Sequence, residues 1–489
     1  MFVVVGSGPA GVACAHALLQ RGAKVTMLDA GLDLESDRKA QVAALRSVPH
    51  DRWSAESLRF LHDGVSVEAG GIPLKMAYGS SFPYREPVDL PLSAEGAEGK
   101  PSYARGGFSN VWGASMLPFR SEDIAGWPIT AADLEPHYRA VLELIPNSEL
   151  KASAQAGALL RDLGSAKTAF QFSPSRLAVD PKCVRCGLCL YGCPYGYIYN
   201  SADTLSALRA DRNFTYRPGV VVQRVTEASS HVELSGVTVD RETPFAMSVD
   251  RAFLACGVFS TARILLASVE AFGETVRAAD NCYFLLPLLR YRNQKDVRRE
   301  ALHTLAQVFL ELHDDAIGRH TVHLQVYTYN ELLRQQIRNM VGPLAPLAEG
   351  AVLGRLLLIQ GYLHSDLSPS INVSLDRDGT LSLTGEPNAR TKPALDALRK
   401  RMWSERSALR AFPVARAMRV GKPGRGFHTG GTFPMRAQPG RLETDVDGRL
   451  RGFSRLHVVD ASVFPSLPAT TITLSVMANA HRIGGATVA

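Results

Sequence analysis

The sequence predicts an α/β protein that opens with a Rossmann-like dinucleotide-binding unit. Residues 2–5 form an apolar run typical of a buried parallel strand, and the loop Gly6-Ser7-Gly8-Pro9-Ala10-Gly11 follows directly. Apolar residues then recur with helical spacing as far as Leu19, and a second apolar run stops at Asp29. The order of strand, G-x-G-x-x-G loop, helix, strand and acid is the signature of dinucleotide binding.

Each residue of this signature has a physical task. Gly6 permits the tight turn, Gly8 lets the backbone approach a pyrophosphate, and Gly11 lets the helix pack close to the strand. The helix N-terminus offers free amides to the phosphates. Asp29 is expected to accept hydrogen bonds from a ribose. The motif alone does not separate FAD from NAD.

Composition narrows the class of protein. A chain of 489 residues is long enough for two domains, and 46% hydrophobic with 21% charged residues is ordinary for a soluble enzyme. The net charge of +7 is spread along the chain, so we interpret it as a solvated basic surface; nothing resembles a nucleic-acid-binding module. No targeting segment is recognisable and no apolar run reaches bilayer length. We therefore expect a cytoplasmic protein, with export on a partner subunit as the alternative.

Four of the seven cysteines crowd into one short stretch, Cys183-x-x-Cys186-x-x-Cys189-x-x-x-Cys193-Pro194. This spacing is that of bacterial ferredoxins. It predicts one iron–sulfur cluster, [4Fe–4S] if Cys193 is the fourth ligand and [3Fe–4S] if it is not. Cys282 is a conceivable outside ligand. Structural zinc and free thiols are the alternatives.

Five later segments resemble the glucose–methanol–choline (GMC) family of FAD oxidoreductases: residues 105–113, 126–138, 220–222, 253–257 and 456–462. The resemblance implies a second glycine-rich loop along the flavin, and a last helix, 475–483, whose N-terminus points at the isoalloxazine ring. With the first loop, the FAD contacts that we expect are Gly6, Gly8, Gly11, Asp29, Gly106, Gly107, Ser109, Asn110, Val222, Gly257, Asp460 and Ala461.

The same resemblance implies the domain organisation. A Rossmann-like FAD-binding domain would be assembled from residues 1–165, 201–270 and 436–489. The cysteine-rich iron–sulfur segment would occupy residues 166–200. Residues 271–435 would form an α+β substrate domain built on an antiparallel sheet, in which residues 371–383 are a hairpin.

His428 is the candidate catalytic residue. The segment from His428 to Met435 resembles the family's H-x-x-G-T-x-x-M motif, whose histidine takes the hydroxyl proton while hydride leaves the substrate carbon. A histidine that titrates near neutrality in a glycine-rich loop suits a general base. The family's second histidine or asparagine is replaced by Thr471, which can form hydrogen bonds but cannot serve as a base.

These features predict an FAD-dependent dehydrogenase that oxidises an alcohol, with a sugar or glycoside hydroxyl as one candidate. Electrons would leave through the cluster to an acceptor protein or a quinone. Two alternatives remain open. One is a reductase that runs in the reverse direction. The other is a flavin electron-transfer or binding subunit without alcohol chemistry, its cysteines holding zinc.

Residues 331–362 carry two apolar runs, residues 340–344 and 352–359. We interpret them as core helix of the substrate domain. The alternative is an amphipathic segment that lies on a membrane or against an electron-accepting subunit.

Overall fold

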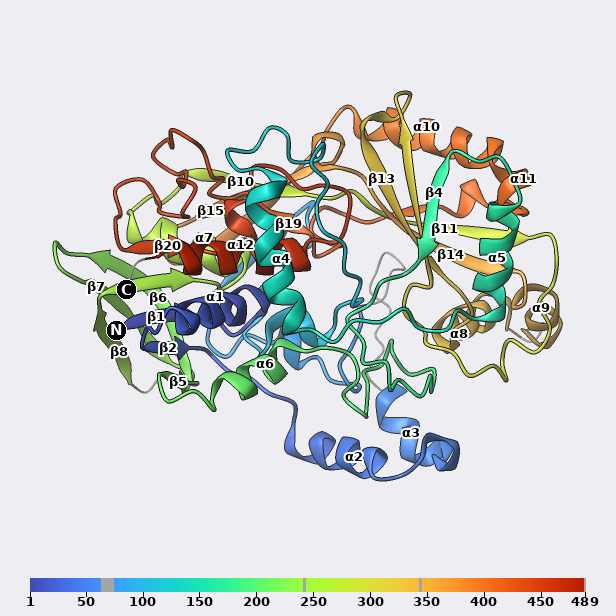
Figure 1. The fold of residues 1–489 in the computed structure, drawn as a ribbon, viewed down its shortest axis with the longest axis horizontal. Coiled ribbons are helices and arrows are strands. Elements are labelled where there is room, and N and C mark those ends of the chain that lie inside the picture. The colour runs from blue at the N-terminus through green and yellow to red at the C-terminus, as the bar shows by residue number, and fades with distance from the viewer. Residues whose placement is uncertain (63–73, 241–242, 343–344, 488–489) are drawn as a thin grey trace.

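The computed structural model describes residues 1–62, 74–240, 243–342 and 345–487. Figure 1 shows two parts side by side, one around a parallel sheet that holds both ends of the chain and one around an antiparallel sheet. This is the predicted pairing of a Rossmann-like domain with a second domain on an antiparallel sheet.

The parallel sheet is assembled from four separate stretches of chain. Its order is β20-β9-β1-β2-β5, and every neighbouring pair is parallel. The strands are β1 (Phe2–Val5), β2 (Val25–Leu28), β5 (Phe214–Arg217), β9 (Arg251–Leu254) and β20 (Leu456–Val458). All strands except the edge strand β5 are almost entirely buried, which explains why their sequences are continuous apolar runs.

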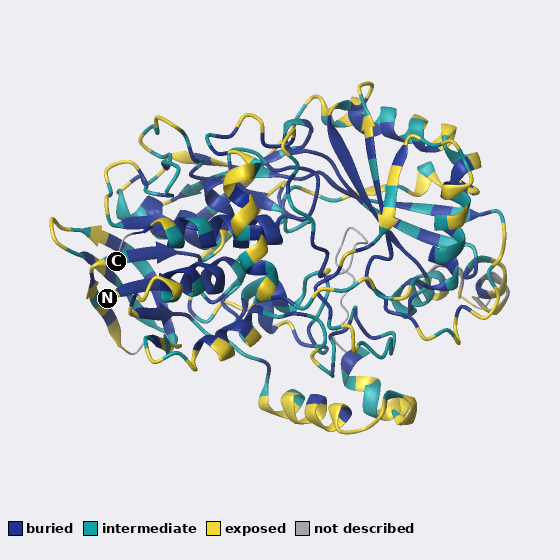
Figure 2. Ribbon diagram, in the orientation of Figure 1, coloured by how far each residue is buried: buried dark blue, intermediate teal, exposed yellow. Residues whose placement is uncertain are grey.

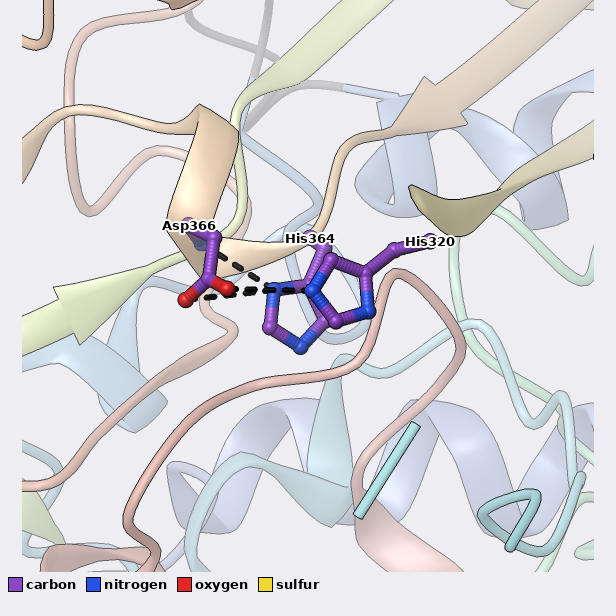
Figure 3. A group of neighbouring side chains, drawn as sticks. All are labelled: His320, His364 and Asp366. Atoms are coloured by element: carbon purple, nitrogen blue, oxygen red, sulfur yellow. Dashed lines mark hydrogen bonds and ion pairs between the residues drawn. The ribbon is translucent and has the colours of Figure 1, made fainter. Parts of the chain in front are cut away.

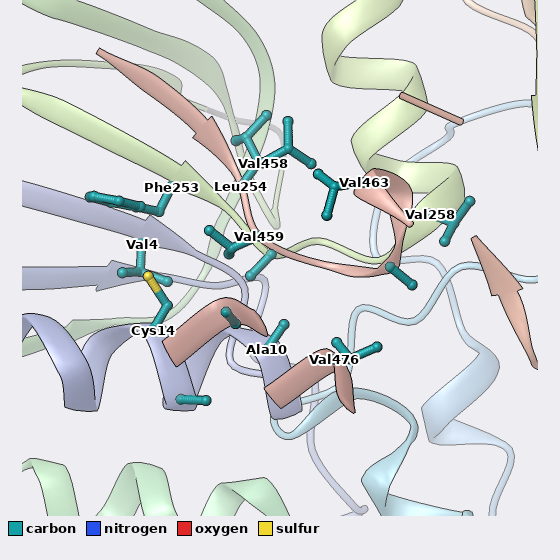
Figure 4. Packing of buried hydrophobic residues seen from close by; sticks show 14 of the residues in the cluster. Val4, Ala10, Cys14, Phe253, Leu254, Val258, Val458, Val459, Val463 and Val476 are labelled. Carbon is teal, nitrogen blue, oxygen red and sulfur yellow. The ribbon is translucent and has the colours of Figure 1, made fainter. Parts of the chain in front are cut away.

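Three helices pack together beside this sheet: α1 (Pro9–Gln20), α4 (Ala131–Glu143) and α12 (Thr473–Ala486). Small residues let α1 and α12 approach closely, because a Cβ at Gly484 would lie 2.9 Å from the carbonyl oxygen of Cys14. Figure 4 shows Ala10 and Cys14 of α1 packed with Val4, Phe253 and Val458 of the sheet. The first and last elements of the chain thus share one core.

Two smaller sheets and α7 (Val258–Ser268) complete this part. One is antiparallel, with β6 (Val220–Glu227), β7 (Val232–Thr238) and β8 (Pro244–Val249). The other is mixed, with the order β19 (Thr429–Gly430), β10 (Thr275–Asp280), β15 (Ser370–Leu375), β16 (Leu381–Glu386) and β3 (Leu92–Glu95). The hairpin expected at residues 371–383 forms as β15 and β16, but in this mixed sheet. Its alternating apolar side chains, Ile371 and Val373 among them, join the core of the nucleotide-binding part.

The second part is built on antiparallel strands in the order β17-β11-β14-β13-β12-β4, with β18 also paired to β11. Helices α5 (Ala154–Gly164), α10 (Thr391–Ser404) and α11 (Arg406–Leu409) share a core with one face of this sheet. Figure 2 shows the strands largely buried beneath exposed helix surfaces. The strands are β4 (Phe170–Pro174), β11 (Tyr283–Arg290), β12 (Val308–Asp314), β13 (Gly318–Tyr327), β14 (Leu356–Tyr362), β17 (Ala411–Pro413) and β18 (Arg419–Val420).

The interpretation of residues 352–359 as core helix is wrong for most of that run. Helix α9 (Ala345–Val352) ends where the run begins, and residues 356–362 form β14 in the middle of the sheet. Gly361 leaves room for Phe284 of the neighbouring strand, since a Cβ at residue 361 would lie 2.1 Å from Phe284 Cζ. The first run enters α8 (Glu331–Val341), but residues 343–344 lie outside the described part of the chain. No described helix is long and apolar enough to cross a membrane.

Helices α2 (Ser36–Arg46) and α3 (Ala55–His62) form a separate layer, and α6 (Ser201–Leu208) follows the cysteine segment. Leu45 of α2 and Leu61 of α3 pack against Leu188 and Tyr191 of the cysteine loop. This layer fixes the loop against the nucleotide-binding part.

Histidines at the contact of α1, α4 and α12 predict an acid-sensitive fold. His137 Nδ1 lies 2.9 Å from His481 Nδ1, and the rings of His16 and His481 lie 5.6 Å apart. Burial, together with His137 and His16, lowers the pKa of His481 to about 4. The unfolded chain takes up a proton at this position near pH 6.5 while the folded chain stays neutral, so stability falls as pH drops from about 6.5 to 4.

We expect His481→Leu to remove roughly 2 kcal/mol of the stability difference between about pH 7.5 and pH 5. Denaturant unfolding curves at the two pH values measure this difference. His313→Gln, at an exposed histidine, is the matched control and should leave the difference unchanged. An equal effect of the two substitutions would contradict the prediction.

Candidate active site

A cavity of about 510 Å³ runs from the carboxyl edge of the parallel sheet to the open face of the antiparallel sheet. At one end it is lined by the first glycine loop and Asp29, and at the other by β13, β14 and His428. Ligands of open α/β sheets bind at this edge of the strands. The shape suits a long ligand that reaches from one part of the protein to the other.

Three helices begin at the cavity wall without a side-chain cap. The N-cap residues of α1, α7 and α12 are Gly8, Gly257 and Ile472, and all three line the cavity. Their free amides and helix dipoles favour negative charge inside the cavity. Gly6 has φ +101°, and a Cβ there would lie 2.5 Å from the Ala255 carbonyl oxygen, so the turn before α1 needs glycine. The residues present fit a dinucleotide pyrophosphate.

Most of the predicted cofactor residues line this cavity: Gly6, Gly8, Asp29, Gly107, Ser109, Val222, Gly257, Asp460 and Ala461. Three predicted residues lie behind the wall instead. A Cβ at Gly11 would lie 1.9 Å from the Gly6 carbonyl oxygen, and one at Gly106 would lie 2.4 Å from Asn200 Oδ1. Asn110 Nδ2 donates to the Gly107 carbonyl at 2.7 Å. In this structure Gly11, Gly106 and Asn110 shape the two loops.

Asp29 connects the two glycine loops. Its Oδ2 accepts hydrogen bonds from Ser7 Oγ at 2.5 Å and Tyr216 Oη at 3.0 Å, and Ser7 Oγ accepts one from the Gly106 amide at 2.9 Å. Burial raises the pKa of Asp29 to about 6, although these hydrogen bonds oppose the shift. A ribose hydroxyl that donates to Asp29 would favour the charged form.

His428 stands at the far end of the cavity in a fixed frame. Phe427 before it has φ +55°, and β19 after it pairs with β10. The imidazole stacks on Tyr362, with ring centroids 4.5 Å apart and planes 22° apart. A non-glycine residue with positive φ beside a candidate catalytic group is the kind of strain found at functional sites.

The protonation of His428 differs from the expectation. Burial, with a smaller contribution from the nearby His323, lowers its pKa to about 3, so the ring is neutral at pH 7 rather than titrating near neutrality. Its Nδ1 and the Thr471 Oγ1 are both buried without a hydrogen-bond partner among the described residues, and both side chains line the cavity. A neutral imidazole and a hydroxyl are therefore available to a ligand.

The four clustered cysteines surround one small enclosed cavity. Cys183, Cys186, Cys189 and Cys193 all line it, and all are free thiols. Burial raises the pKa of Cys186 to about 12, so the thiols must lose protons to bind a metal. Cys282 does not line this cavity and lies in the core of the antiparallel part.

A distant segment, residues 303–305, closes this cavity, and no sequence motif marks it. His303 and Leu305 line the cavity, and Thr304 hydrogen-bonds to Cys189. From the other side, the Tyr197 amide donates to Cys193 Sγ at 3.3 Å. Amide and hydroxyl donors to sulfur stabilise thiolates and tune a metal centre bound to them.

No three of the four sulfur atoms come within 4.8 Å of one another, because the one group of described residues that does so contains no cysteine. Tetrahedral zinc with bonds of about 2.3 Å would hold its sulfurs roughly 3.8 Å apart, so in this form the side chains would have to move to bind one zinc ion.

The cysteine cavity adjoins the large cavity. Leu190, the residue after Cys189, lines the large cavity, as do Trp112 and Lys75. Lys75 Nζ donates to the Trp112 carbonyl at 2.7 Å. Burial lowers the pKa of Lys75 to about 8, while Cys189 and Cys193 raise it. A cation thus lies between the thiols and the large cavity, a position that sequence motifs did not reveal.

Among the described residues, the group whose ligand atoms all lie within 4.8 Å of one another is His320, His364 and Asp366. Figure 3 shows the two imidazoles face to face, and their centroids are 3.5 Å apart with planes only 5° apart. Metal bonds of roughly 2.1 Å follow the nitrogen lone pairs, which lie in the ring plane, so one ion cannot lie in both planes. Arg319 also donates to Asp366 at 2.9 Å. We interpret the group as a structural ion-pair network.

Asp366 should therefore stabilise the fold without metal. The hydrogen bond from His320 and the charge of Arg319 hold the pKa of this carboxyl well below its ordinary value, despite partial burial. Its contribution is present above about pH 4 and is lost as pH falls below that. We expect Asp366→Asn to lower the melting temperature at neutral pH, and we expect the difference from the unmodified protein to shrink progressively as pH falls below about 4. A melting temperature of the unmodified protein that rises with added zinc would contradict this interpretation.

Comparisons with known proteins agree with this geometry at both ends of the chain. Residues 4–37 match the family model of the NAD(P)-binding Rossmann-like domain. Residues 378–480 match the family model described as GMC oxidoreductase. A search of curated proteins gives no match.

Solved structures resemble the whole chain. Pyridoxine 4-oxidase from Mesorbium loti aligns with a TM-score of 0.62 at 17% identity, covering 99% of this chain and 98% of its own. A variant of formate oxidase from Aspergillus oryzae RIB40 aligns with a TM-score of 0.65 at 15% identity, covering 99% and 97%. The chain therefore has a Rossmann-like dinucleotide-binding domain and a second, antiparallel-sheet domain, as GMC oxidoreductases do.

Proposed function

We propose that this chain is an FAD-dependent dehydrogenase of the GMC type that oxidises an alcohol and passes the electrons to an iron–sulfur cluster. The observation that carries the alcohol chemistry is the neutral His428, which lies in the wall of a cavity that begins at a dinucleotide-binding loop. The match of residues 378–480, which contain His428 and Thr471, supports the same class.

His428 would accept the hydroxyl proton of the substrate. Its neutral ring offers a lone pair at working pH, and the stacked Tyr362 together with β19 keeps it in place. Both glycine loops and the N-termini of α1 and α12 would hold FAD, which would supply a hydride acceptor for the carbon that bears the hydroxyl. The alcohol thus loses two electrons and two protons in all, one proton to His428 and one within the hydride.

Thr471 would orient the substrate hydroxyl. Its Oγ1 is buried without a partner in the described structure, so it can donate to or accept from a ligand hydroxyl. Because threonine is not a base, the proton would go to His428 alone. This assignment favours an enzyme over a subunit without substrate chemistry. In such a subunit, His428 Nδ1 and Thr471 Oγ1 would be buried at the cavity with no function.

The cysteine cavity would hold the cluster, with Cys183, Cys186, Cys189 and Cys193 as ligands. The ferredoxin-like spacing of these cysteines in the sequence supports a cluster over zinc, and the donors to sulfur and the neighbouring Leu190 in the wall of the large cavity suit an electron-transfer centre there. A cluster transfers one electron at a time, which suits an acceptor protein or a quinone. Lys75, between the two cavities, would balance thiolate charge. The reduction potential of the electron-transfer partner sets the direction of the reaction. Reduction of a carbonyl compound is the reverse of the same chemistry.

The first test concerns the base. We expect His428→Ala to slow substrate-driven flavin reduction by roughly 10²- to 10⁴-fold, because general-base catalysis contributes this much. Anaerobic stopped-flow absorbance measures the rate. His320→Ala, in the ion-pair network outside the cavity lining, is the control. If His428→Ala keeps FAD bound and reduces the flavin at the normal rate, His428 is not the base.

The second test concerns the cluster. Anaerobically purified protein should contain iron and sulfide and give an EPR signal before or after dithionite, on top of the flavin absorbance. Cys186→Ser should lower the iron content and leave FAD bound, whereas Cys282→Ser should keep both, because Cys282 lies away from the cysteine cavity. Stoichiometric zinc with flavin alone would overturn the cluster and leave the alcohol chemistry intact.

A further inference from the structure

Two glutamine side chains lie side by side on the antiparallel sheet beside the candidate base. Gln325 of β13 and Gln360 of β14 are directly paired in register, and both line the large cavity. Directly paired residues have Cβ atoms about 5 Å apart, close enough for both amides to reach one ligand group. Tyr362, two residues from Gln360, stacks on His428, so the pair lies roughly 7 Å along the strand from that contact.

A buried chain of polar groups reaches Gln325 along its own face of the sheet. Arg120 forms an ion pair with Glu311 of β12, and Glu311 Oε1 lies 3.6 Å from His323 Nδ1. His323 Nε2 lies 3.3 Å from Gln325 Nε2, and Tyr327 Oη donates to Gln325 Oε1 at 3.4 Å. His323 is 1% exposed, and Gln325 is 2% exposed. The chain therefore ends in the cavity wall with little contact with water.

The charge of Glu311 favours one orientation of the Gln325 amide. His323 is neutral, because burial lowers its pKa to about 3. A neutral imidazole has one N–H, and although Glu311 Oε1 at 3.6 Å is too far from Nδ1 for a hydrogen bond, its negative charge favours that proton on Nδ1, the nitrogen that faces it. His323 Nε2 is then an acceptor, so the Gln325 atom beside it must be the amide nitrogen. One N–H of Gln325 is used on His323, and the second is left for the cavity.

Gln360 supplies the complementary group. Its Nε2 donates to the hydroxyl of Tyr362, which leaves its carbonyl oxygen as an acceptor. A hydroxyl group both accepts and donates a hydrogen bond. One donor on Gln325 and one acceptor on Gln360 match a single hydroxyl.

We propose that Gln325 and Gln360 form a binding subsite for a second hydroxyl of the substrate, and that Glu311 and His323 are positioning residues for the Gln325 amide. The substrate class is then a polyol or sugar, in which one hydroxyl meets His428 and another meets the amide pair. This inference rests on the proposed alcohol oxidation. A monohydric alcohol leaves the amides unpaired in a buried wall, which disfavours its binding.

Steady-state rates with a dye acceptor test the subsite on two sets of probes. The polyols are D-sorbitol and D-glucose, and the monohydric alcohols are 1-hexanol and cyclohexanol, with the same number of carbons. We expect the intact protein to prefer a polyol, and Gln325→Leu to raise KM for that polyol about tenfold or more with little change for the monohydric alcohols. Replacement of the amide by an apolar side chain of similar length removes the hydrogen bond without opening a large cavity.

Glu311→Gln tests the positioning chain, since it keeps the size of the side chain and removes its charge. It should raise KM for the polyol in the same direction, with kcat nearly unchanged. Asp314→Asn is the matched control, because Asp314 lies on the same strand but pairs with Arg401. FAD content and melting temperature confirm that each variant is folded, and for a variant that fails to fold, His323→Gln replaces Glu311→Gln.

The outcomes separate the two levels of the proposal. Reduction of the flavin by none of the four alcohols, in protein that holds FAD, would count against alcohol oxidation itself. Oxidation of both sets with equal KM, or an equal effect of Gln325→Leu on both, would overturn the subsite and leave the proposed function standing. A polyol KM that responds to Gln325→Leu but not to Glu311→Gln would keep the subsite and remove the positioning role.

Discussion

The architecture depends on one buried carboxylate, that of Asp460. It accepts hydrogen bonds from the Gly257 amide at 2.9 Å, from Thr261 Oγ1 at 2.5 Å and from the Ser462 amide at 2.9 Å. These contacts attach the turn after β20 to the first turn of α7, about two hundred residues earlier in the chain. They fix the C-terminal segment, and α12 with it, at the edge where α1 also begins. Burial raises the pKa of this carboxyl, and the hydrogen bonds to it together with the dipole of α7 offset only part of that shift.

The parts of the fold that depend on local patterns could be predicted from the sequence. The unit from β1 to Asp29 forms as expected, because the alternation of strand, glycine turn and helix is set by neighbouring residues. The strands at 220–222, 253–254 and 456–458 are also present. The run at 356–359 was misassigned because a short apolar run fits a buried strand and a helix equally well. Pairing with β11 and β13, which lie far away in the sequence, decides it.

The candidate site was predictable only where a motif carries it. His428 and Thr471 line one cavity, and the four cysteines line another. Lys75, His303 and the chain from Glu311 to Gln325 could not be found from sequence, because each acts through partners on other strands or loops. The expectation that His428 titrates near neutrality is wrong for the same reason. Burial lowers its pKa, and burial is a property of the assembled cavity.

In the proposed reaction, substrate recognition and proton acceptance would come from separate pieces of this chain. His428 sits on a short segment locked into the mixed sheet by two residues of β19, whereas the side chains that face it across the cavity project from alternate positions of β13 and β14. Exchange of those alternate residues would change the shape and polarity of the opposite wall and leave the backbone ladder intact. Related proteins could thus diverge in preferred alcohol through a handful of strand positions while keeping the same proton acceptor.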